Sequence, residues 1–196
     1  MGKVRWHVTM SLDGFIAGPN DSMDWVFGYI ELTSATAPTS DPSEIQRILQ
    51  ETIQSTGSVL SGRRSYNVGR EPGQRPEARK VLGGAWTGPI FVLTHHPPED
   101  EQDSTITFVS GHIINVVARA VAAAAGKDVL VIGADVARQC LPEGLIGEIQ
   151  IHLAPVLLGD GVRFFNSPGL PQGVRLQTVD VTRSGQLTNL RFRVLK

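Results

Sequence analysis

The chain has 196 residues, of which 41% are hydrophobic, and its 18 basic residues nearly balance its 19 acidic ones. This composition predicts one globular domain over residues 1–196 and, without a basic stripe, argues against nucleic acid as a partner. No apolar run has the length of a membrane span, so no membrane association is expected. Cys140 is the only cysteine and no secretory signal is evident, which favours a reducing, cytoplasmic setting.

The N-terminal segment predicts a strand followed by a long loop. Residues 4–10 alternate as a central strand, with His7 and Thr9 on one face. Residues 11–21 are rich in Gly, Asp and Asn and predict a loop, and residues 24–30 predict a short helix.

A clear helix signal begins after a Ser/Thr-rich segment, residues 33–40, that we expect to be mobile. Asp41 can cap this helix, Pro42 suits its first turn, Glu44 completes a capping box, and Gly57 is expected to end it. The predicted buried stripe consists of Ile45, Ile48, Leu49, Thr52 and Ile53.

The remainder of the chain alternates between strands and helices and then ends in a hairpin. Strands are expected over residues 58–60, 90–94, 105–109, 129–132 and 148–154, the last half-exposed, and helices over residues 113–125 and 134–141. Residues 70–79 predict a surface loop, and residues 175–183 and 187–195 predict a hairpin. This order predicts an α/β fold whose sheet is parallel in the middle, with antiparallel strands after the last helix.

Residues 129–132 form an apolar run that leads through Gly133 into a predicted helix. Such a turn places unpaired backbone N–H groups at the carboxyl edge of a sheet, where an anion, most often a phosphate, can bind. The alternative is a strand–turn–helix connection without a ligand. Only Gly133 is present and Ala134 follows it, so the spaced glycines of the classical dinucleotide fingerprint are missing.

Two further predicted strands also end in residues that suit phosphate binding. Gly62 and Arg63 follow one of these strands, and His95 follows the other. Because ligands of parallel sheets gather at the carboxyl ends of the strands, we expect Gly62, His95 and Gly133 to converge on a single pyrophosphate.

Four motifs in this order resemble the dihydrofolate reductase-like family, and more narrowly the riboflavin-biosynthesis reductase domain and its stand-alone bacterial relatives. The motifs are Met10-Ser11-Leu12-Asp13-Gly14-Phe15-Ile16-Ala17, Ser61-Gly62-Arg63-Arg64-Ser65-Tyr66, Val131-Ile132-Gly133-Ala134 and Ala154-Pro155-Val156-Leu157-Leu158-Gly159-Asp160-Gly161. The resemblance covers nearly the whole chain. It implies a three-layer α/β fold with helices on both faces of a mixed, mostly parallel sheet, NADPH as cofactor, and a homodimer.

The resemblance also implies a set of cofactor-binding residues. They are Val8, Thr9 and Ile16 beside the nicotinamide; Gly62, Arg63, Arg64 and Ser65, and Ile132, Gly133, Ala134, Asp135 and Val136, at the pyrophosphate; and Thr94, His95 and His96 at the adenosine 2′-phosphate. Glycine lets the backbone approach a phosphate, and guanidinium pairs with it bidentately. The alternative is a polar strand end and two solvated arginines at a helix start.

For the substrate, the resemblance implies Asp13 in orientation or proton handling, Asp24 as a second candidate, and Gly159, Asp160 and Gly161 on the far side of the pocket. Asp13 can equally be a plain turn residue, because Asp-Gly favours turns. Dihydrofolate reductases carry an acid five residues after the tryptophan; here Trp25 is followed at that distance by Ile30. That departure argues against folate reduction. The adjacent Phe164 and Phe165 are expected to belong to the core.

The resulting hypothesis is an NADPH-dependent oxidoreductase that transfers hydride to a small heterocyclic or ribosylamino-pyrimidine substrate. A non-catalytic NADP(H)- or small-ligand-binding module is the main alternative, and a purely structural dimerisation domain is a third. The five histidines show no ligand spacing, so no metal site is expected, and the zinc motif of nucleobase deaminases is absent.

Overall fold

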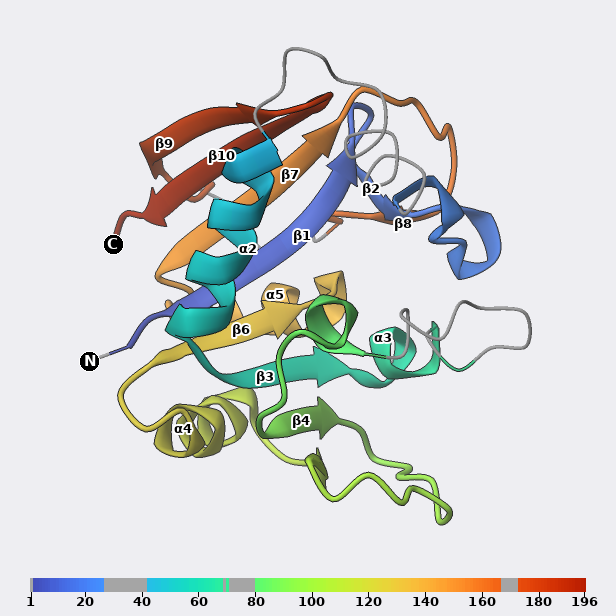
Figure 1. Ribbon diagram of the computed structural model, residues 1–196. Helices are drawn as coiled ribbons and strands as arrows, with labels where there is room; N and C mark the ends of the chain where they lie inside the picture. The colour runs from blue at the N-terminus through green and yellow to red at the C-terminus, as the bar shows by residue number, and fades with distance from the viewer. Residues whose placement is uncertain (1, 27–41, 69, 71–79, 167–172) are drawn as a thin grey trace.

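The computed structural model describes residues 2–26, 42–68, 70, 80–166 and 173–196 (Figure 1). The strands of the main sheet are β1 (Val4–Ser11), β3 (Thr56–Gly62), β4 (Ile90–Leu93), β5 (Ile106–Val109), β6 (Asp128–Ile132), β7 (Glu148–Ala154), β9 (Leu176–Ser184) and β10 (Leu187–Val194). They pair in the order β5-β4-β3-β6-β1-β7-β10-β9. The first six are mutually parallel, and β10 and β9 close one edge as an antiparallel hairpin.

The centre of the sheet is built from apolar runs that both faces bury. Val59 and Leu60 of β3 and Leu130 and Val131 of β6 are fully buried, as expected for central strands of a parallel sheet. β1 lies between β6 and β7, which confirms the prediction of a central first strand. Trp6 points from it into the core and is 1% exposed.

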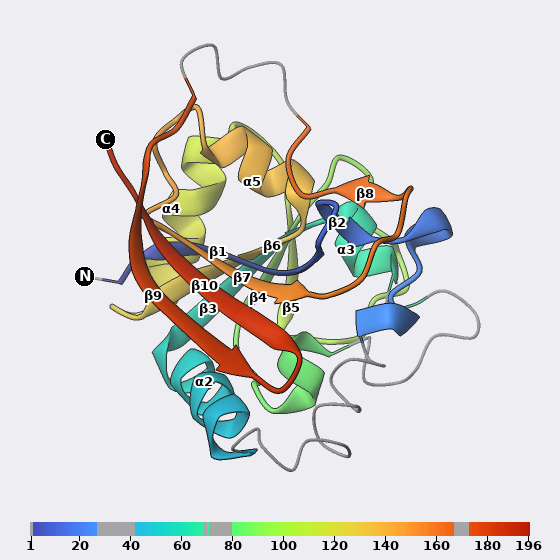
Figure 2. The same cartoon turned by 90° about the horizontal axis from the view of Figure 1, so that it is seen from above.

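Helices cover both faces of the sheet, so the molecule has three layers (Figure 2). The helix α2 (Pro42–Ser55) lies on one face, while α4 (Ile113–Ala123) and α5 (Ala134–Cys140) lie on the other. The short α3 (Arg63–Val68) follows β3 directly, and 3₁₀ turns occupy η1 (Pro19–Asp21) and η3 (Val81–Gly84). No helix in these parts of the chain is both long and apolar enough to cross a membrane.

A small second sheet was not expected from the sequence. β2 (Phe15–Ala17) pairs antiparallel with β8 (Val162–Arg163), which joins the loop after β1 to the segment after β7. Gly161 allows this pairing: it has φ +132°, and a Cβ there would collide with the Ala17 carbonyl oxygen. Two-residue strands carry too little periodicity to be detected in a sequence.

Two predictions about the long helix were wrong. The helix ends at Ser55, and Gly57 already lies inside β3. Gly57 is required for packing, because a Cβ there would collide with backbone atoms of Ala124. Leu49, expected in the buried stripe, is 38% exposed, whereas Thr52 is 2% exposed. Residue Asp41 and the segments 27–30, 33–40 and 71–79 lie outside the described residues, so the predictions made for them remain open.

The prediction for residues 148–154 was half right. β7 is a strand, but it runs parallel to β1 and most of it is buried. Its alternation of apolar and polar residues suggested a solvated face. Instead, the polar residues Glu148 and Gln150 are 2% and 8% exposed. Glu148 pairs with Lys3 and Arg5, and Gln150 lies in register with His7 on β1 and Arg191 on β10. The C-terminal hairpin and the helices after β5 and β6 were predicted correctly.

Candidate active site

A cleft of about 840 Å³ opens at the carboxyl ends of the central parallel strands. Among the predicted site residues it is lined by Val8, Thr9, Ile16, Gly62, Arg63, Arg64, Ser65, Ile132, Gly133, Ala134, Asp135 and Gly161. The predicted site residues outside its lining are Asp13, Asp24, Thr94, His95, His96, Val136, Gly159 and Asp160. The cleft therefore unites residues from β1, β3 and β6, three strands that are well separated in the chain.

The turns that end β3 and β6 touch each other at the base of this cleft. Gly133 has φ +88° and ψ 165°, a conformation that is essentially restricted to glycine. A Cβ at Gly133 would collide with the Ser65 hydroxyl, and one at Gly62 would meet a methyl group of Val136 at 3.6 Å. The two turns therefore pack against each other, and both contribute to the lining of one cleft.

The arginines after β3 are held in different ways. Arg63 donates from Nε to the Asn67 side chain at 2.8 Å and from a terminal nitrogen to the His96 carbonyl at 2.7 Å. This second bond ties the end of β4 to the start of α3. Arg64 instead donates from Nε to both carboxylate oxygens of Asp21, at 2.7 and 2.9 Å. The pKa of Arg64 is raised mainly by its hydrogen bonds to Asp21.

Sequence reasoning missed Arg138, which lines the cleft beside the start of α5. Its guanidinium pairs with the Asp135 carboxylate, which also accepts from the Gln139 amide at 3.0 Å. The only available signal was the spacing of three residues on a helix, which favours such pairs. Arg138 neutralises the one carboxylate that would otherwise repel an anion at this turn.

Asp13 organises two loops. Its carboxylate accepts hydrogen bonds from the Ser11 hydroxyl at 2.6 Å and from the backbone N–H groups of Leu158 and Gly159 at 3.1 and 2.7 Å. The Ser11 hydrogen bond contributes most to lowering the pKa of Asp13 from 3.8 to about 2, and the two backbone donors add to it against the effect of burial. Asp13 is therefore ionised at neutral pH and cannot donate a proton there.

Of the other predicted substrate residues, Gly161 lines the cleft, whereas Asp24, Gly159 and Asp160 lie outside its lining. Asp24 is exposed at the first helical turn after Met23. Asp160 accepts from the N–H of Gly161 at 2.7 Å, so its carboxylate shapes the turn itself. Phe164 stacks on Trp6 with ring centroids 4.0 Å apart, consistent with its predicted place against the core.

The predicted phosphate-binding side chains after β4 lie beside the cleft. His95 and His96 are exposed, and the Thr94 hydroxyl accepts a hydrogen bond from the His96 N–H at 3.1 Å. Because β4 is the parallel neighbour of β3, this segment still reaches the same edge of the sheet.

The other wall of the cleft carries a pair of histidines that sequence reasoning did not link. His7, on β1, lines the cleft, and its Nε2 lies 2.6 Å from Nε2 of His152 on β7. Nδ1 of His152 lies 2.6 Å from the Asn189 side-chain oxygen. Burial is the main cause that lowers the pKa of each histidine, and the neighbouring His152 and Arg5 lower that of His7 further.

Below the histidines the same face of the sheet carries a buried ion cluster. The Arg5 guanidinium contacts Asp128 at 2.8 Å and Glu148 at 3.2 Å, and Lys3 also pairs with Glu148. Burial opposes ionisation of Glu148, but the Lys3 hydrogen bond and the Arg5 charge outweigh it and lower the pKa of Glu148.

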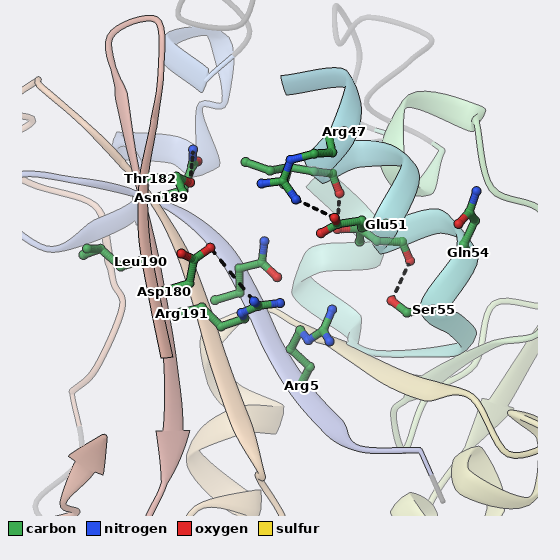
Figure 3. A pocket seen from close by; sticks show the side chains of 13 residues that line it. Arg5, Arg47, Glu51, Gln54, Ser55, Asp180, Thr182, Asn189, Leu190 and Arg191 are labelled. Atoms are coloured by element: carbon green, nitrogen blue, oxygen red, sulfur yellow. Dashed lines mark hydrogen bonds and ion pairs between the residues drawn. The ribbon is translucent and has the colours of Figure 1, made fainter. Parts of the chain in front are cut away.

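A second cavity, of about 440 Å³, lies between α2 and this polar face (Figure 3). Arg47 and Glu51 approach it from α2, and Asn189 and Arg191 approach it from β10. Nε of Arg191 is buried without a hydrogen-bond partner among the described residues. Asn189 contributes to this cavity and also contacts His152, so the two hollows are joined by one line of polar groups.

Comparison with solved structures identifies proteins of the same fold. A protein described as a riboflavin biosynthesis protein from Shewanella sp. PV-4 aligns over 100% of both chains with a TM-score of 0.72 and 20% identity. A Thermotoga maritima diaminohydroxyphosphoribosylaminopyrimidine deaminase/5-amino-6-(5-phosphoribosylamino)uracil reductase aligns with a TM-score of 0.62 and 16% identity. That alignment covers 99% of this chain but only 57% of the Thermotoga protein.

Dihydrofolate reductase from Enterococcus faecalis, in complex with NADP(H), aligns over 100% of this chain and 98% of its own with a TM-score of 0.57 and 14% identity. These similarities establish a dihydrofolate reductase-like α/β fold, as predicted. No curated protein sequence matches the chain. The RibD C-terminal domain family, however, matches residues 2–190. The chain therefore belongs to the RibD C-terminal domain family.

Proposed function

We propose that the protein is an NADPH-dependent reductase of a small heterocyclic or ribosylamino-pyrimidine substrate. The observation that carries this proposal is that one cleft is lined both by the turns at Gly62 and Gly133 and by His7 and Thr9 of β1. The substrate class follows from the family and from the Thermotoga relative, whose name includes a phosphoribosylaminouracil reductase.

The residues present fit the proposed cofactor. The cleft volume lies within the range of small-molecule and cofactor sites. Gly133 allows the turns after β3 and β6 to pack closely, since a Cβ there would collide with the Ser65 hydroxyl. Arg63, whose hydrogen-bond partners are both neutral, provides positive charge for the phosphates, whereas the charges of Arg64 and Arg138 are each balanced by a carboxylate, Asp21 and Asp135. When bound, NADPH would supply the hydride.

The protein's own contribution is position and exclusion of water. Val8 and Ile16 give the cleft an apolar surface beside Thr9, at the junction between β1 and the small second sheet. Holding the two reacting groups together in such a setting replaces a bimolecular encounter by a preorganised one. The tether from Asp13 to Leu158 and Gly159 fixes the loop that precedes β2.

Calorimetric titration with NADPH tests the cofactor. Wild type should bind saturably, and Arg63→Ala should weaken binding about tenfold to a hundredfold, the effect of losing charge-assisted hydrogen bonds worth roughly 1.5–3 kcal/mol. Arg193→Ala is the matched control, because Arg193 is exposed on β10 and its side chain makes one hydrogen bond among the described residues, to Gln177 at 3.3 Å. Because Arg63 also holds the His96 carbonyl, thermal unfolding of each variant should be measured alongside. Absence of NADPH binding by wild type would refute the proposal.

The second candidate is a non-catalytic module that binds NADP(H) or another small ligand. Its supporting observation is that the carboxylates lining the cleft, Asp21 and Asp135, are each paired with an arginine. None of the described carboxyl groups of the cleft is thus set to donate a proton. Oxidation of NADPH, followed by absorbance with dihydrofolate or with the riboflavin-pathway ribosylaminopyrimidine, would exclude this candidate.

The homodimer remains a prediction. β9 forms the outer edge of the sheet and carries the exposed apolar side chains of Leu176, Val179 and Val181. An uncovered edge of this length is a ready template for pairing with another strand, and sedimentation equilibrium would determine whether a second copy of the chain pairs there.

A further inference from the structure

A line of four hydrogen-bonding side chains crosses the polar half of the sheet and ends in the cleft. The Asn189 amide nitrogen lies 2.8 Å from the Ser184 hydroxyl, and its oxygen lies 2.6 Å from Nδ1 of His152. Nε2 of His152 then lies 2.6 Å from Nε2 of His7. Register makes the line possible: Asn189 pairs with His152 across β10 and β7, and His152 pairs with Thr9 across β7 and β1.

The direction of the hydrogen bonds along this line follows from the placement of the Asn189 amide. The amide nitrogen faces two hydroxyls, Ser184 at 2.8 Å and Thr182 at 3.4 Å, and Figure 3 shows Asn189 beside Thr182. The amide oxygen can only accept, so Nδ1 of His152 carries the proton. In a neutral His152 the other nitrogen, Nε2, is then an acceptor, and His7 must donate to it from Nε2.

A neutral His7 that donates from Nε2 has an unprotonated Nδ1. That atom has no hydrogen-bond partner among the described residues, and it belongs to a side chain that lines the cleft. Burial favours the neutral form of both rings, since it is the main cause that lowers their pKa values. Arg5, whose charge lowers the pKa of His7 further and so also favours the neutral ring, is itself paired with Asp128 and Glu148.

We propose that His7 is a specificity-determining residue whose Nδ1 accepts a hydrogen bond from an N–H group of the ligand, with His152 and Asn189 as the positioning residues that fix its tautomer. The ligand class is therefore a nitrogen heterocycle that presents an amino or ring N–H group to β1. This inference rests on the proposed function only in placing the substrate in this cleft; the state of the histidines can be measured without any ligand. A neutral acceptor at this position favours ligands that present an N–H group over ligands that present a carbonyl, because a carbonyl here would leave two acceptors facing each other.

Nuclear magnetic resonance tests the tautomers directly. Long-range proton–nitrogen spectra of the ligand-free protein distinguish protonated from unprotonated ring nitrogens. We expect the Nε2–H tautomer for His7 and the Nδ1–H tautomer for His152. The reverse assignment, with a proton on Nδ1 of His7, would overturn the proposal, because His7 would then be a donor toward the cleft.

Two substitutions of His7 test the role of Nδ1 in binding, with 5,6-diaminouracil as the probe in calorimetric titrations. His7→Asn places a side-chain oxygen near the position of Nδ1 and should keep the dissociation constant within about threefold, the effect of a weak hydrogen bond at the low end of its range. His7→Gln places its polar end near Nε2 and loses the acceptor at Nδ1, so binding should weaken about tenfold or more. His112→Asn, at an exposed position before α4, is the control and should change nothing.

Equal losses in His7→Asn and His7→Gln would overturn the proposal, because a merely structural His7 would not distinguish them. Failure of wild type to bind the probe would also overturn it. The outcome is independent of the proposed redox activity: if NADPH does not bind but the probe binds and the variants separate as expected, the proposed reductase function fails and the acceptor role of His7 stands.

Discussion

The two halves of the central sheet differ in the groups that they place around the cleft. In β4, β3 and β6 the core of the sheet is made by buried apolar side chains such as Leu60, Val92 and Leu130, and these strands contribute to the site chiefly through the turns at their ends, such as the turn at Gly133. In β1, β7 and β10 the strands themselves carry charged and polar side chains on one face, among them Arg5, Glu148 and His152. The first half can bind a ligand through its backbone geometry, whereas the second can choose among ligands through its side chains.

The two halves also differ in how their stability is achieved. Burial of apolar strands contributes in proportion to the area removed from water and tolerates exchange of similar side chains. A buried ion cluster depends on each member, since removal of one partner leaves an uncompensated charge. Both members of the central pair are buried, with the side chain of Arg5 9% exposed and that of Glu148 3% exposed, and Asp128 is a second carboxylate partner of Arg5.

Glu148→Gln should therefore give the largest effect. The substitution keeps the volume but removes the charge that faces Lys3 and Arg5. We expect the free energy of unfolding to fall by about 3 kcal/mol, the low end of the range for breaking a buried pair, because Asp128 still pairs with Arg5. Denaturant unfolding monitored by circular dichroism measures it. Glu143→Gln makes the same chemical change at an exposed position and should stay within about 0.5 kcal/mol of wild type.

The same cluster should make the protein sensitive to acid. The pKa of Glu148 is lower in the folded protein than in the unfolded chain, so its contribution to stability is complete above the unfolded pKa of about 4.3 and is lost as the pH falls below that value. Glu148→Gln should be correspondingly less pH-dependent between pH 5 and pH 3 than wild type. If Glu148→Gln were as stable as Glu143→Gln, the polar half would not depend on its ion cluster.

The contrast between the halves explains what the sequence could and could not predict. The apolar runs ending at Gly62 and Gly133 are local signals, and they identified the strands, the turns and their common edge. The polar half depends on pairing between segments far apart, as with His7 and His152, separated by 145 positions. Each histidine alone is an ordinary polar residue on a strand, and only the register of β1, β7 and β10 brings the two together with Asn189.

The backbone half is probed by a pair of glycine substitutions. Gly133→Ala forces a side chain into a backbone conformation restricted to glycine and against the Ser65 hydroxyl, and should cost about 1–3 kcal/mol of unfolding free energy together with a loss of NADPH affinity. Gly62→Ala is the control at the neighbouring turn, because its Cβ would meet Val136 at an ordinary 3.6 Å. We expect its stability to match wild type or rise slightly, by up to about 1 kcal/mol. Equal effects at both glycines, measured by thermal unfolding and calorimetry, would contradict the distinction between the two turns.

The smallest effect is expected at Asp13, which joins the loop after β1 to the segment after β7. Asp13→Asn retains one oxygen acceptor and loses the other, so it should weaken the hold on either Gly159 or Ser11 and lower the melting temperature slightly at neutral pH.

Since the pKa of Asp13 in the folded protein is about 2, below its unfolded value, its contribution is present above about pH 4 and is lost as the pH falls through 2. The backbone amide resonance of Gly159 should titrate with that midpoint in wild type and stay constant in Asp13→Asn. Asp160→Asn is the matched control, because among the described residues the Asp160 carboxylate accepts a hydrogen bond from the N–H of the adjacent Gly161 and from no other group. If the Gly159 resonance still titrated in Asp13→Asn but no longer did so in Asp160→Asn, Asp160 rather than Asp13 would be the carboxylate that holds Gly159, and the prediction would be wrong.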